Sequence, residues 1–319
     1  MSVTSQPAYS LAGKRVWVSG HTGMVGSAVV RRLQSERCEL LTADRKTLDL
    51  QRQADVERWV DRERPQAVFV VAATVGGIVA NSTRPAEFIY DNLVIETNVI
   101  GAARRVGVEK LLFVASSCIY PRLSPQPMPE DVLLTGPLEP TNDMYAVAKI
   151  AGIMMCRAFR QQYGCDFISA VPSNLYGPGD HFEVESSHVV PGLIAKAHAA
   201  KVSGGGELVI WGTGAPRREL MYVDDLADAL VFLMQRYSDE LHINVGVGDD
   251  VSIRDLAEQV ASTVGMQGKL RYDATRPDGM PRKLVDASRL LAMGWKPQVS
   301  LEEGLRRTYD WYLKNVVRP

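Results

Sequence analysis

Residues 20–26, GHTGMVG, constrain the fold of this chain most strongly, because they join two different kinds of apolar pattern. The preceding segment, KRVWVS, is rich in β-branched and aromatic residues and predicts a strand. The following residues repeat apolar side chains at helical spacing as far as Leu33. Three glycines between a strand and a helix allow close backbone approach and leave free N–H groups at the helix start. The segment therefore predicts a loop that binds the pyrophosphate of a dinucleotide.

The same alternation of strand and helix continues through the first half of the chain. Apolar runs predict strands at 38–43, 66–73, 110–117 and 166–171, and helical patterns cover 53–63, 86–106 and 142–163. Strands that are apolar throughout and separated by helices are typical of a parallel sheet covered on both faces. We therefore predict an α/β fold with a doubly wound parallel sheet of the Rossmann type.

The regular alternation breaks after Pro172, which indicates a smaller mixed C-terminal substrate domain. Helices are expected near 191–201, 252–264 and 300–314, and LHINVGVG, residues 241–248, is expected to return as a strand to the main sheet. We assign residues 13–175 and about 219–250 to an NADP-binding domain. Residues from about 176 to 218 and 251–319 form a discontinuous substrate-binding domain, and 1–12 a loose N-terminal tail.

Composition and charge exclude several classes of function. The chain has 319 residues, of which 46% are hydrophobic, and a net charge of -1, which provides no field for nucleic acid or an anionic membrane. Its apolar runs are too short to span a membrane, and the N-terminus lacks the pattern of a signal peptide. The cysteines (Cys38, Cys118, Cys156, Cys165) and the five histidines show no metal-binding spacing. We expect a cytoplasmic protein without a metal site.

The end of the second predicted strand should select the cofactor. Asp44, Arg45 and Lys46 follow this strand in the segment TADRKTLDL. A carboxylate there accepts a hydrogen bond from the ribose 2′-OH of NAD, whereas basic side chains pair with the 2′-phosphate of NADP. Two cations beside one anion favour NADP.

Tyr145 and Lys149 lie four residues apart in a predicted helix, so their side chains share one face. A nearby ammonium favours the phenolate and is expected to lower the tyrosine pKa from about 10. Tyr145 would then exchange a proton near neutral pH. After a glycine-rich dinucleotide loop, this pair indicates a reductase site.

Ser116 and Cys118 follow the apolar run FVA at the carboxyl end of a predicted strand, where open α/β sheets bind their ligands. In an extended chain these residues, two apart, point to the same face. Ser116 can hydrogen-bond a substrate oxygen beside Tyr145. A site made of serine, tyrosine and lysine does not require Cys118.

Several motifs together resemble one family, the GDP-L-fucose synthases, which are extended short-chain dehydrogenases/reductases. The spacing GxxGxxG in the glycine loop is typical of that wider group. The motifs are GHTGMVGSA, VGGIVAN, SSCIYP, EPTNDMYAVAKIAG, PSNLYGPGD, SHVVPGLI, WGTGAPRRE, VDD and PDGMPRK, and the resemblance extends from Lys14 to about Tyr312. The SSC and SHVVP elements are more specific than the dehydrogenase core.

The resemblance implies a bifunctional oxidoreductase and isomerase that converts GDP-4-keto-6-deoxy-D-mannose to GDP-L-fucose with NADPH. It implies that Tyr145 protonates the C4 oxygen, that Lys149 tunes Tyr145 and holds the nicotinamide ribose, and that Ser116 orients the ketone. Cys118 and His188 match the base and acid that epimerise C3 and C5. The family also implies a GDP-sugar substrate and a homodimer.

The resemblance further implies two sets of binding residues. The residues matching NADP contacts are Gly20, Gly23, Met24, Val25, Gly26, Arg45, Ser116, Lys149, Pro172, Ser173, Asn174, Leu175 and His188. The residues matching contacts with the GDP-sugar are Lys196, Trp211, Arg218 and Asp278. Two positions depart from the family: Thr22 stands where some members carry a basic residue, and Asp44 precedes Arg45.

Elementary chemistry agrees with these roles. A ketone at C4 acidifies the protons on C3, and inverting that centre or C5 needs a base on one face of the ring and an acid on the other. Cysteine, with a reference pKa of about 8.5, and histidine, of about 6.5, both exchange protons near neutral pH. The enolate forms on the oxygen that Tyr145 and Ser116 address, so one oxyanion site serves epimerisation and reduction.

Three alternatives remain open at this point. A colitose-type epimerase/reductase acting on a GDP-4-keto-dideoxysugar would share every motif. An NAD-retaining 4-epimerase of a UDP-sugar would have serine, tyrosine and lysine but no reason for Cys118 with His188. A non-catalytic NADP sensor would typically lose the Tyr145–Lys149 pair.

Overall fold

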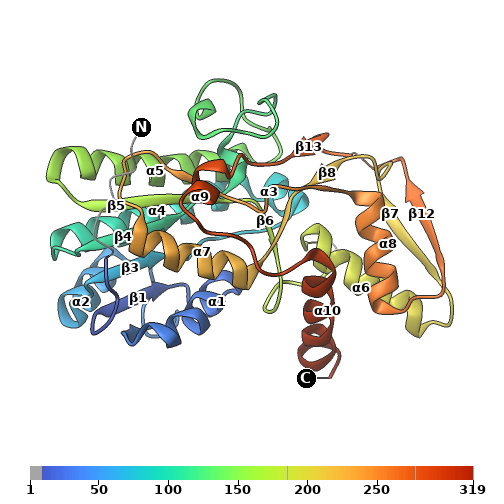
Figure 1. Cartoon of the computed structure of the whole chain (residues 1–319), viewed down its shortest axis with the longest axis horizontal. Helices are drawn as coiled ribbons and strands as arrows, with labels where there is room; N and C mark the ends of the chain where they lie inside the picture. The colour runs from blue at the N-terminus through green and yellow to red at the C-terminus, as the bar shows by residue number, and fades with distance from the viewer. Residues whose placement is uncertain (1–8, 185, 277, 319) are drawn as a thin grey trace.

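A six-stranded parallel sheet forms the larger part of this computed structural model, which describes residues 9–184, 186–276 and 278–318. The strand order is β10-β5-β4-β3-β1-β2, as Figure 1 shows on its left side. The strands are β1 (Arg15–Ser19), β2 (Glu39–Leu41), β3 (Ala67–Val70), β4 (Lys110–Val114), β5 (Asp166–Pro172) and β10 (Ile243–Val245). The order reverses at β1, which is where such sheets bind ligands. The predicted doubly wound fold is confirmed.

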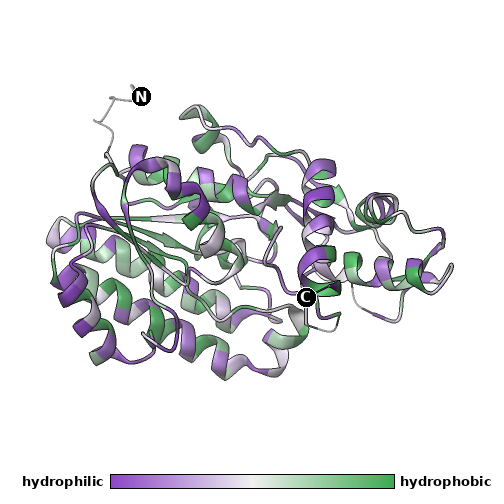
Figure 2. Cartoon of the chain, turned by 90° about the horizontal axis from the view of Figure 1, so that it is seen from below, coloured by the Kyte–Doolittle hydropathy of each residue, from purple (hydrophilic) through white to green (hydrophobic). Residues whose placement is uncertain are grey.

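Helices cover both faces of this sheet. On one face α1 (Met24–Leu33) packs with α7 (Val223–Arg236) over a shared apolar core. On the other face lie α2 (Gln53–Glu63), α4 (Pro85–Arg105) and α5 (Asp143–Tyr163), and α4 and α5 pack along each other. In Figure 2 the helices carry alternating purple and green bands, as expected when one face is polar and the other apolar.

Short segments connect these elements. They are α3 (Ile78–Thr83), α9 (Ser288–Ala292), and the 3-10 turns η1 (Gln34–Glu36), η2 (Ser117–Ile119) and η3 (Glu130–Val132). The turn η2 corrects the predicted strand 110–117, because β4 already ends at Val114. The apolar run continues beyond the point where strand pairing stops, so apolar character alone placed the end too late.

A second, smaller region extends on the right of Figure 1 and has its own core. Its helices are α6 (Val189–Val202), α8 (Ile253–Val264) and α10 (Leu301–Tyr312), followed by the π-helical turn η4 (Leu313–Val317). Its strands are β6 (Asn174–Tyr176), β7 (Glu207–Trp211), β8 (Arg217–Arg218), β9 (Leu220–Tyr222), β11 (Val251–Ser252), β12 (Lys269–Asp273) and β13 (Arg282–Lys283). This region includes β6 and β9, which the predicted division placed partly or wholly in the cofactor domain, and the division into domains stays a prediction.

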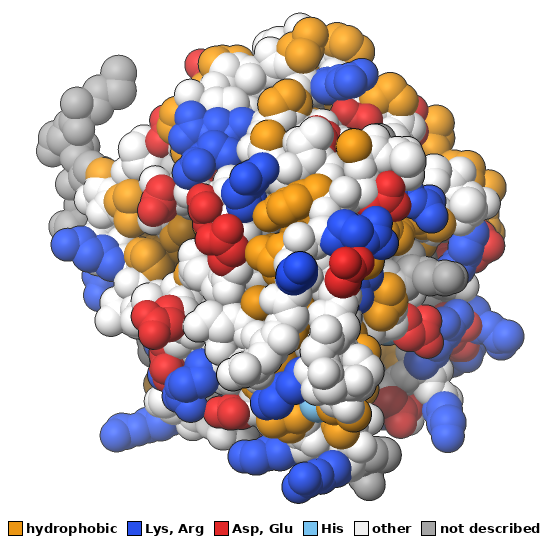
Figure 3. All heavy atoms as spheres, turned by 90° about the vertical axis from the view of Figure 1, so that its right-hand side faces the viewer, with side chains coloured by type: hydrophobic (Ala, Val, Ile, Leu, Met, Phe, Trp, Pro, Cys, Tyr) orange, Lys and Arg blue, Asp and Glu red, His pale blue; other side chains and the backbone are white. Residues whose placement is uncertain are grey.

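The surface of the smaller region carries charges of both signs (Figure 3). Figure 3 shows lysine and arginine interspersed with aspartate and glutamate on the end of the molecule that carries this smaller region. Residues 1–8 of the predicted loose tail lie outside the described part of the chain. The prediction is wrong for the rest of the tail, because Leu11 is buried and the Tyr9 hydroxyl donates to Glu109 at 2.9 Å. Across the described residues, every helix is too short or too polar to cross a membrane.

Candidate active site

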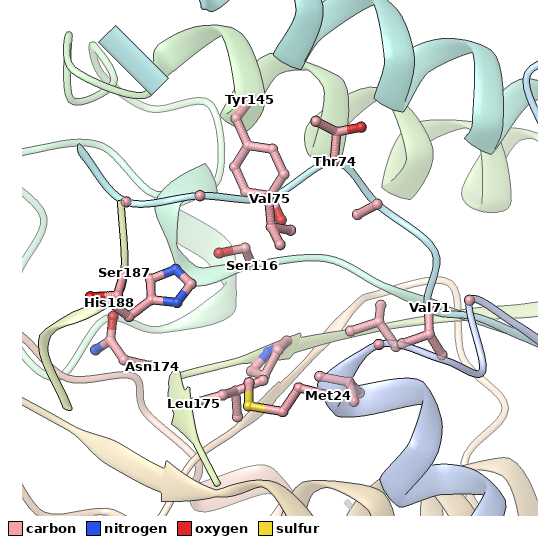
Figure 4. Close-up of a pocket in the computed structure, with 18 of the residues that line it drawn as sticks. Met24, Val71, Thr74, Val75, Ser116, Tyr145, Asn174, Leu175, Ser187 and His188 are labelled. Carbon is pink, nitrogen blue, oxygen red and sulfur yellow. The ribbon is translucent and has the colours of Figure 1, made fainter. Parts of the chain in front are cut away.

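A cavity of about 720 Å³ lies where the carboxyl ends of the central strands meet the smaller region. Its wall is formed by the loop after β1, the segments after β3 and β4, one face of α5, and the start of α6. Figure 4 shows Tyr145, Ser116 and His188 grouped at one end of the cavity, and Met24, Val71 and Leu175 at the other. The cavity therefore contains residues from both parts of the chain.

Most of the residues predicted for the site line this cavity. They are Gly20, Gly23, Met24, Val25, Gly26, Arg45, Ser116, Tyr145, Lys149, Pro172, Ser173, Asn174, Leu175, His188, Lys196, Trp211 and Arg218. Cys118 and Asp278 are not among the lining residues. The fold thus gathers segments that are far apart in the sequence, whereas the individual roles of these residues remain predictions.

The glycine loop has the geometry that its sequence predicts. Gly20 has φ +78°, and a Cβ there would lie 2.7 Å from the backbone of Ala72. A Cβ on Gly26 would lie 2.1 Å from the carbonyl oxygen of Gly20. A side chain at either position would clash with the backbone. The loop can therefore turn sharply from β1 into the N-terminus of α1. The Nδ1 atom of His21, in the same loop, is buried without a hydrogen-bond partner within the protein.

The segment after β2 separates its acidic residue from its basic ones. The Asp44 carboxylate accepts a hydrogen bond from the backbone N–H of Thr47 at 2.8 Å, and this bonding lowers the pKa of Asp44. Arg45 is exposed at the cavity, and neither Arg45 nor Lys46 forms an ion pair with another described residue. Asp44 is therefore occupied in a turn while Arg45 remains available to an anion.

Tyr145 and Ser116 face each other across one end of the cavity in Figure 4. The expected lowering of the Tyr145 pKa is wrong for this structure: burial raises it well above its ordinary value, and the nearby Cys118 and Glu96 add to the rise. The phenol consequently keeps its proton throughout the neutral range. That protonation state suits a donor of a proton to a ketone oxygen.

The Lys149 ammonium is engaged by an acidic side chain that the sequence analysis did not single out. Its Nζ atom lies 2.8 Å from Oε1 of Glu96, and the side chains of both residues are 2% exposed. Glu96 comes from the middle of α4, on the neighbouring helix. Lys149 therefore lies between Glu96 in the interior and the cavity.

Cys118 lies in the turn η2 and is 6% exposed. The prediction of an extended chain from Ser116 to Cys118 is wrong, because η2 begins at Ser117, but the Ser116 hydroxyl still lies close enough to act on the Cys118 thiol. Burial raises the pKa of the Cys118 thiol, and this rise is opposed by the Lys283 ammonium, the Ser116 hydroxyl and the Lys149 ammonium. Near neutral pH the residue is a thiol surrounded by groups that favour its thiolate.

His188 stands immediately before α6, and its ring points toward Ser116 in Figure 4. The side chain is 47% exposed, whereas Asp180, whose Oδ1 lies 3.9 Å from the His188 Nδ1, is 5% exposed. The Oδ2 atom of Asp180 is buried without a hydrogen-bond partner within the protein. The sequence analysis missed Asp180, although the motif PSNLYGPGD contains it.

Lys196, Trp211 and Arg218, three of the four residues predicted to contact the GDP-sugar, line the cavity. Two cations lie near the Trp211 ring, with Lys196 Nζ 4.7 Å and Arg276 Cζ 5.0 Å from its centroid. Burial lowers the pKa of Lys196, and Arg276 adds to this effect. Asp278 instead accepts hydrogen bonds from the backbone N–H and hydroxyl of Thr213 at 2.7 and 2.8 Å. Asp278 therefore holds the turn after Trp211.

The loop after β3 is a further part of the wall that sequence reasoning assigned only to a family motif. Thr74, Val75, Gly76 and Gly77 line the cavity. The Gly77 N–H donates to the Ser186 carbonyl at 3.1 Å, and a Cβ on Gly77 would lie 2.9 Å from the Ser187 carbonyl oxygen. Paired glycines after an apolar strand were the available signal for this close approach.

Over the described residues, no group of three or more His, Cys, Asp or Glu is arranged to hold a metal ion.

Comparisons with known proteins agree with this architecture. The chain is 56% identical to the GDP-L-fucose synthase of Sinorhizobium fredii over 97% of its own length and 99% of the relative's. It is 57% identical to GDP-L-fucose synthase 1 of Arabidopsis thaliana, over 95% of this chain and 94% of that one. A solved GDP-L-fucose synthetase from Naegleria fowleri bound to NADP superposes with a TM-score of 0.91 at 28% identity, covering 99% of each chain. Residues 16–246 match the family model described as NAD dependent epimerase/dehydratase family, so the chain belongs to that family.

Proposed function

We propose that this chain is a bifunctional epimerase/reductase that converts GDP-4-keto-6-deoxy-D-mannose to GDP-L-fucose by epimerising C3 and C5 and reducing the C4 ketone. One observation carries the proposal: a single cavity holds the glycine loop, Ser116, Tyr145, Lys149 and His188, with Cys118 buried directly behind Ser116. A simple 4-epimerase needs only the first four of these features. The high identity to named GDP-L-fucose synthases supports the assignment.

The residues of the cavity fit NADPH. The close-packed glycine loop and the N-terminus of α1 suit a pyrophosphate, and the unpartnered His21 Nδ1 provides a further polar atom there. Arg45, exposed and without an ion-pair partner among the described residues, is placed for a 2′-phosphate. When bound, NADPH supplies the hydride for C4.

In the reduction, we assign Tyr145 as the proton donor to the C4 oxygen. Its raised pKa keeps the phenol protonated at neutral pH, and the Ser116 hydroxyl holds the same oxygen by a hydrogen bond. Two donors at one oxygen also stabilise an enolate, so the same pair serves the epimerisation. Lys149 binds the nicotinamide ribose from the buried side of the cavity.

In the epimerisation, we assign Cys118 as the base and His188 as the acid. The Cys118 thiol must first lose its proton, which its burial disfavours and the Lys283 and Lys149 ammonium groups favour. His188 approaches from the start of α6 and has Asp180 beside its Nδ1. His188 lines the cavity, whereas Cys118 is buried in η2 outside the lining, so the two groups come from different elements.

The proposal is tested by incubating the purified chain with NADPH and GDP-4-keto-6-deoxy-D-mannose, and identifying the product by NMR. We expect stoichiometric NADPH oxidation and GDP-L-fucose. Turnover only of a GDP-4-keto-3,6-dideoxysugar would assign the colitose-type reaction instead. Interconversion of UDP-glucose and UDP-galactose without net NADPH consumption would assign a 4-epimerase and contradict the proposal.

We also propose a homodimer, from the family resemblance, and a cytoplasmic location, from the cysteines. The four cysteines are free thiols, which agrees with a reducing compartment. Light scattering after size-exclusion chromatography measures the mass of the assembly directly. A mass equal to the 35.1 kDa chain at micromolar concentration would contradict the dimer.

A further inference from the structure

Glu96 and Lys149 form an ion pair in the interior, at the base of the proposed reductase site. Their Oε1 and Nζ atoms lie 2.8 Å apart, and each side chain is 2% exposed. The two residues are 53 positions apart in the sequence and belong to α4 and α5. A buried charge is costly without a partner, so an ammonium held here depends on its carboxylate.

The packing between α4 and α5 is shaped to admit this carboxylate. Gly152 lies on α5, one helical turn after Lys149, and a Cβ there would lie 2.9 Å from Oε2 of Glu96 and 2.3 Å from the Phe113 ring. The Lys149 ammonium also lies 4.8 Å from the centroid of the Phe113 ring, on β4. The carboxylate thus occupies space that any larger residue at 152 would fill.

The Glu96 carboxylate uses only one of its two oxygens in hydrogen bonding within the described part of the protein. The Oε2 atom of Glu96 is buried and has no hydrogen-bond partner within the protein. Burial raises the pKa of Glu96, and the attraction of Lys149 opposes that rise. Among the described residues, Glu96 acts electrostatically on Tyr145 and Cys156 of α5, and Lys149 acts on Cys118 of η2. All three are uncharged when protonated, so Glu96 supplies the negative charge that balances Lys149.

We propose that Glu96 is a positioning residue that keeps Lys149 charged and directed at the nicotinamide ribose and at Tyr145. The inference rests on the proposed function for the role of Lys149, and goes beyond it by assigning the group that maintains that role. Glu96 itself does not line the cavity, so it acts through Lys149 and not on the substrate. An ordinary structural ion pair would stabilise the fold equally well without influencing cofactor binding.

The test is the pH dependence of NADPH binding in Glu96→Gln, measured by fluorescence titration against the wild-type protein at each pH. Glutamine fills nearly the same volume but leaves the ammonium without a counter-charge, so the amine loses its proton more readily. We expect NADPH affinity to fall about tenfold to a hundredfold near pH 8, the range of a hydrogen bond to a charged group, and to recover toward wild type near pH 6. Hydride transfer should follow the same profile.

Two further variants separate positioning from stability. Glu96→Asp retains the charge and should restore most of the wild-type pH profile, and it also serves if the glutamine variant does not fold. Asp166→Asn is a matched control: Asp166 lies 3.1 Å from Lys110, whose side chain is 3% exposed, and neither residue lines the cavity. It should lower the thermal unfolding temperature without changing the pH profile of NADPH binding.

The inference is overturned if Glu96→Gln binds NADPH with the wild-type pH dependence, or loses affinity equally at every pH. Either outcome would make the pair a packing feature. Failure of the proposed function is distinguishable, because it would appear as absence of NADPH oxidation by the wild-type protein with GDP-4-keto-6-deoxy-D-mannose. The binding titrations would still decide the role of Glu96 in that case.

Discussion

Tyr145 and Lys149, which we assign to the reduction, are held differently from His188 and Cys118, which we assign to the epimerisation. Tyr145 and Lys149 project from one long helix, and Lys149 is paired with Glu96 in the interior. The described residues between β6 and His188 form no helix or strand, His188 is 47% exposed, and Cys118 lies in a short turn. The reduction site is therefore built on regular elements, whereas the epimerisation site depends on connecting segments.

This difference indicates how two reactions can share one oxyanion site. Reduction needs a donor whose position relative to the cofactor does not vary, and packed helices provide this. Epimerisation at two carbons needs proton carriers that reach different ring positions, and loop residues have more freedom to move. The following experiments break or sharpen this contrast, from the largest expected effect to the smallest.

Tyr145→Phe should remove the reduction while leaving most of the epimerisation. The variant loses the proton donor to the C4 oxygen, and one positioned acid contributes about 10²–10⁴-fold. Ser116 remains to stabilise the enolate, so deuterium exchange at C3 and C5 in D₂O should fall less. NADPH oxidation and exchange are measured in parallel. A turnover number within about threefold of wild type would exclude Tyr145 as the donor.

Cys118→Ser should do the reverse, slowing deuterium exchange by about 10²-fold while NADPH binding is preserved. Serine is similar in size, but its hydroxyl is a far weaker acid than the thiol and supplies no useful base near neutral pH. Hydride transfer to a sugar not inverted at C3 or C5 would yield products absent from the wild type, which NMR identifies. Exchange at the wild-type rate at both positions would show that Cys118 is only packing.

Arg45→Ala should weaken the binding of NADPH by about tenfold to a hundredfold and leave the binding of NADH nearly unchanged. Only NADPH carries a 2′-phosphate that can form a charged hydrogen bond with Arg45. This variant changes the cofactor-binding part of the site and leaves the proposed acid and base, His188 and Cys118, in place. The ratio of the two dissociation constants is the measurement, and Lys46→Ala is the matched control. An unchanged ratio would place the discrimination between the cofactors elsewhere.

The pH dependence of deuterium exchange should also distinguish the epimerisation groups from the reduction groups. Burial raises the pKa of Cys118, so its thiolate fraction grows by about tenfold per pH unit below that pKa. Exchange at C3 and C5 should therefore rise from pH 7 to about 9 in the wild type, and lose this rise in Cys118→Ser. Tyr145, whose pKa is raised, stays protonated over this range and should not limit the donor function. A flat exchange profile would contradict the role of the thiol.

Asp180→Asn should have the smallest effect. The carboxylate lies 3.9 Å from a half-exposed histidine, and such pairs contribute about 0.2–1 kcal/mol, or up to about fivefold. Removing it should slow exchange by up to this factor between about pH 6 and 8, and leave NADPH binding unchanged. Thermal unfolding provides the control for stability. Equal exchange rates in variant and wild type across this pH range would remove Asp180 from the mechanism.

The sequence determined those features that depend on near neighbours in the chain. The strand, glycine loop and helix at residues 15–33, the placing of Ser116 after β4, and the helical spacing of Tyr145 and Lys149 all follow from local periodicity and from the absence of side chains at Gly20 and Gly26. These patterns do not depend on what packs against them.

Only the tertiary structure decided the electrostatic environment of these residues. The pairing of Lys149 with Glu96, the approach of Asp180 to His188 and the burial of Cys118 required packed elements or the path of a loop. The pKa of Tyr145 moved opposite to the expectation, because burial raises it and the charge of Glu96, which pairs with Lys149, adds to the rise. Protonation depends on burial and on every nearby charge, and these are properties of the packed interior, which no single segment carries.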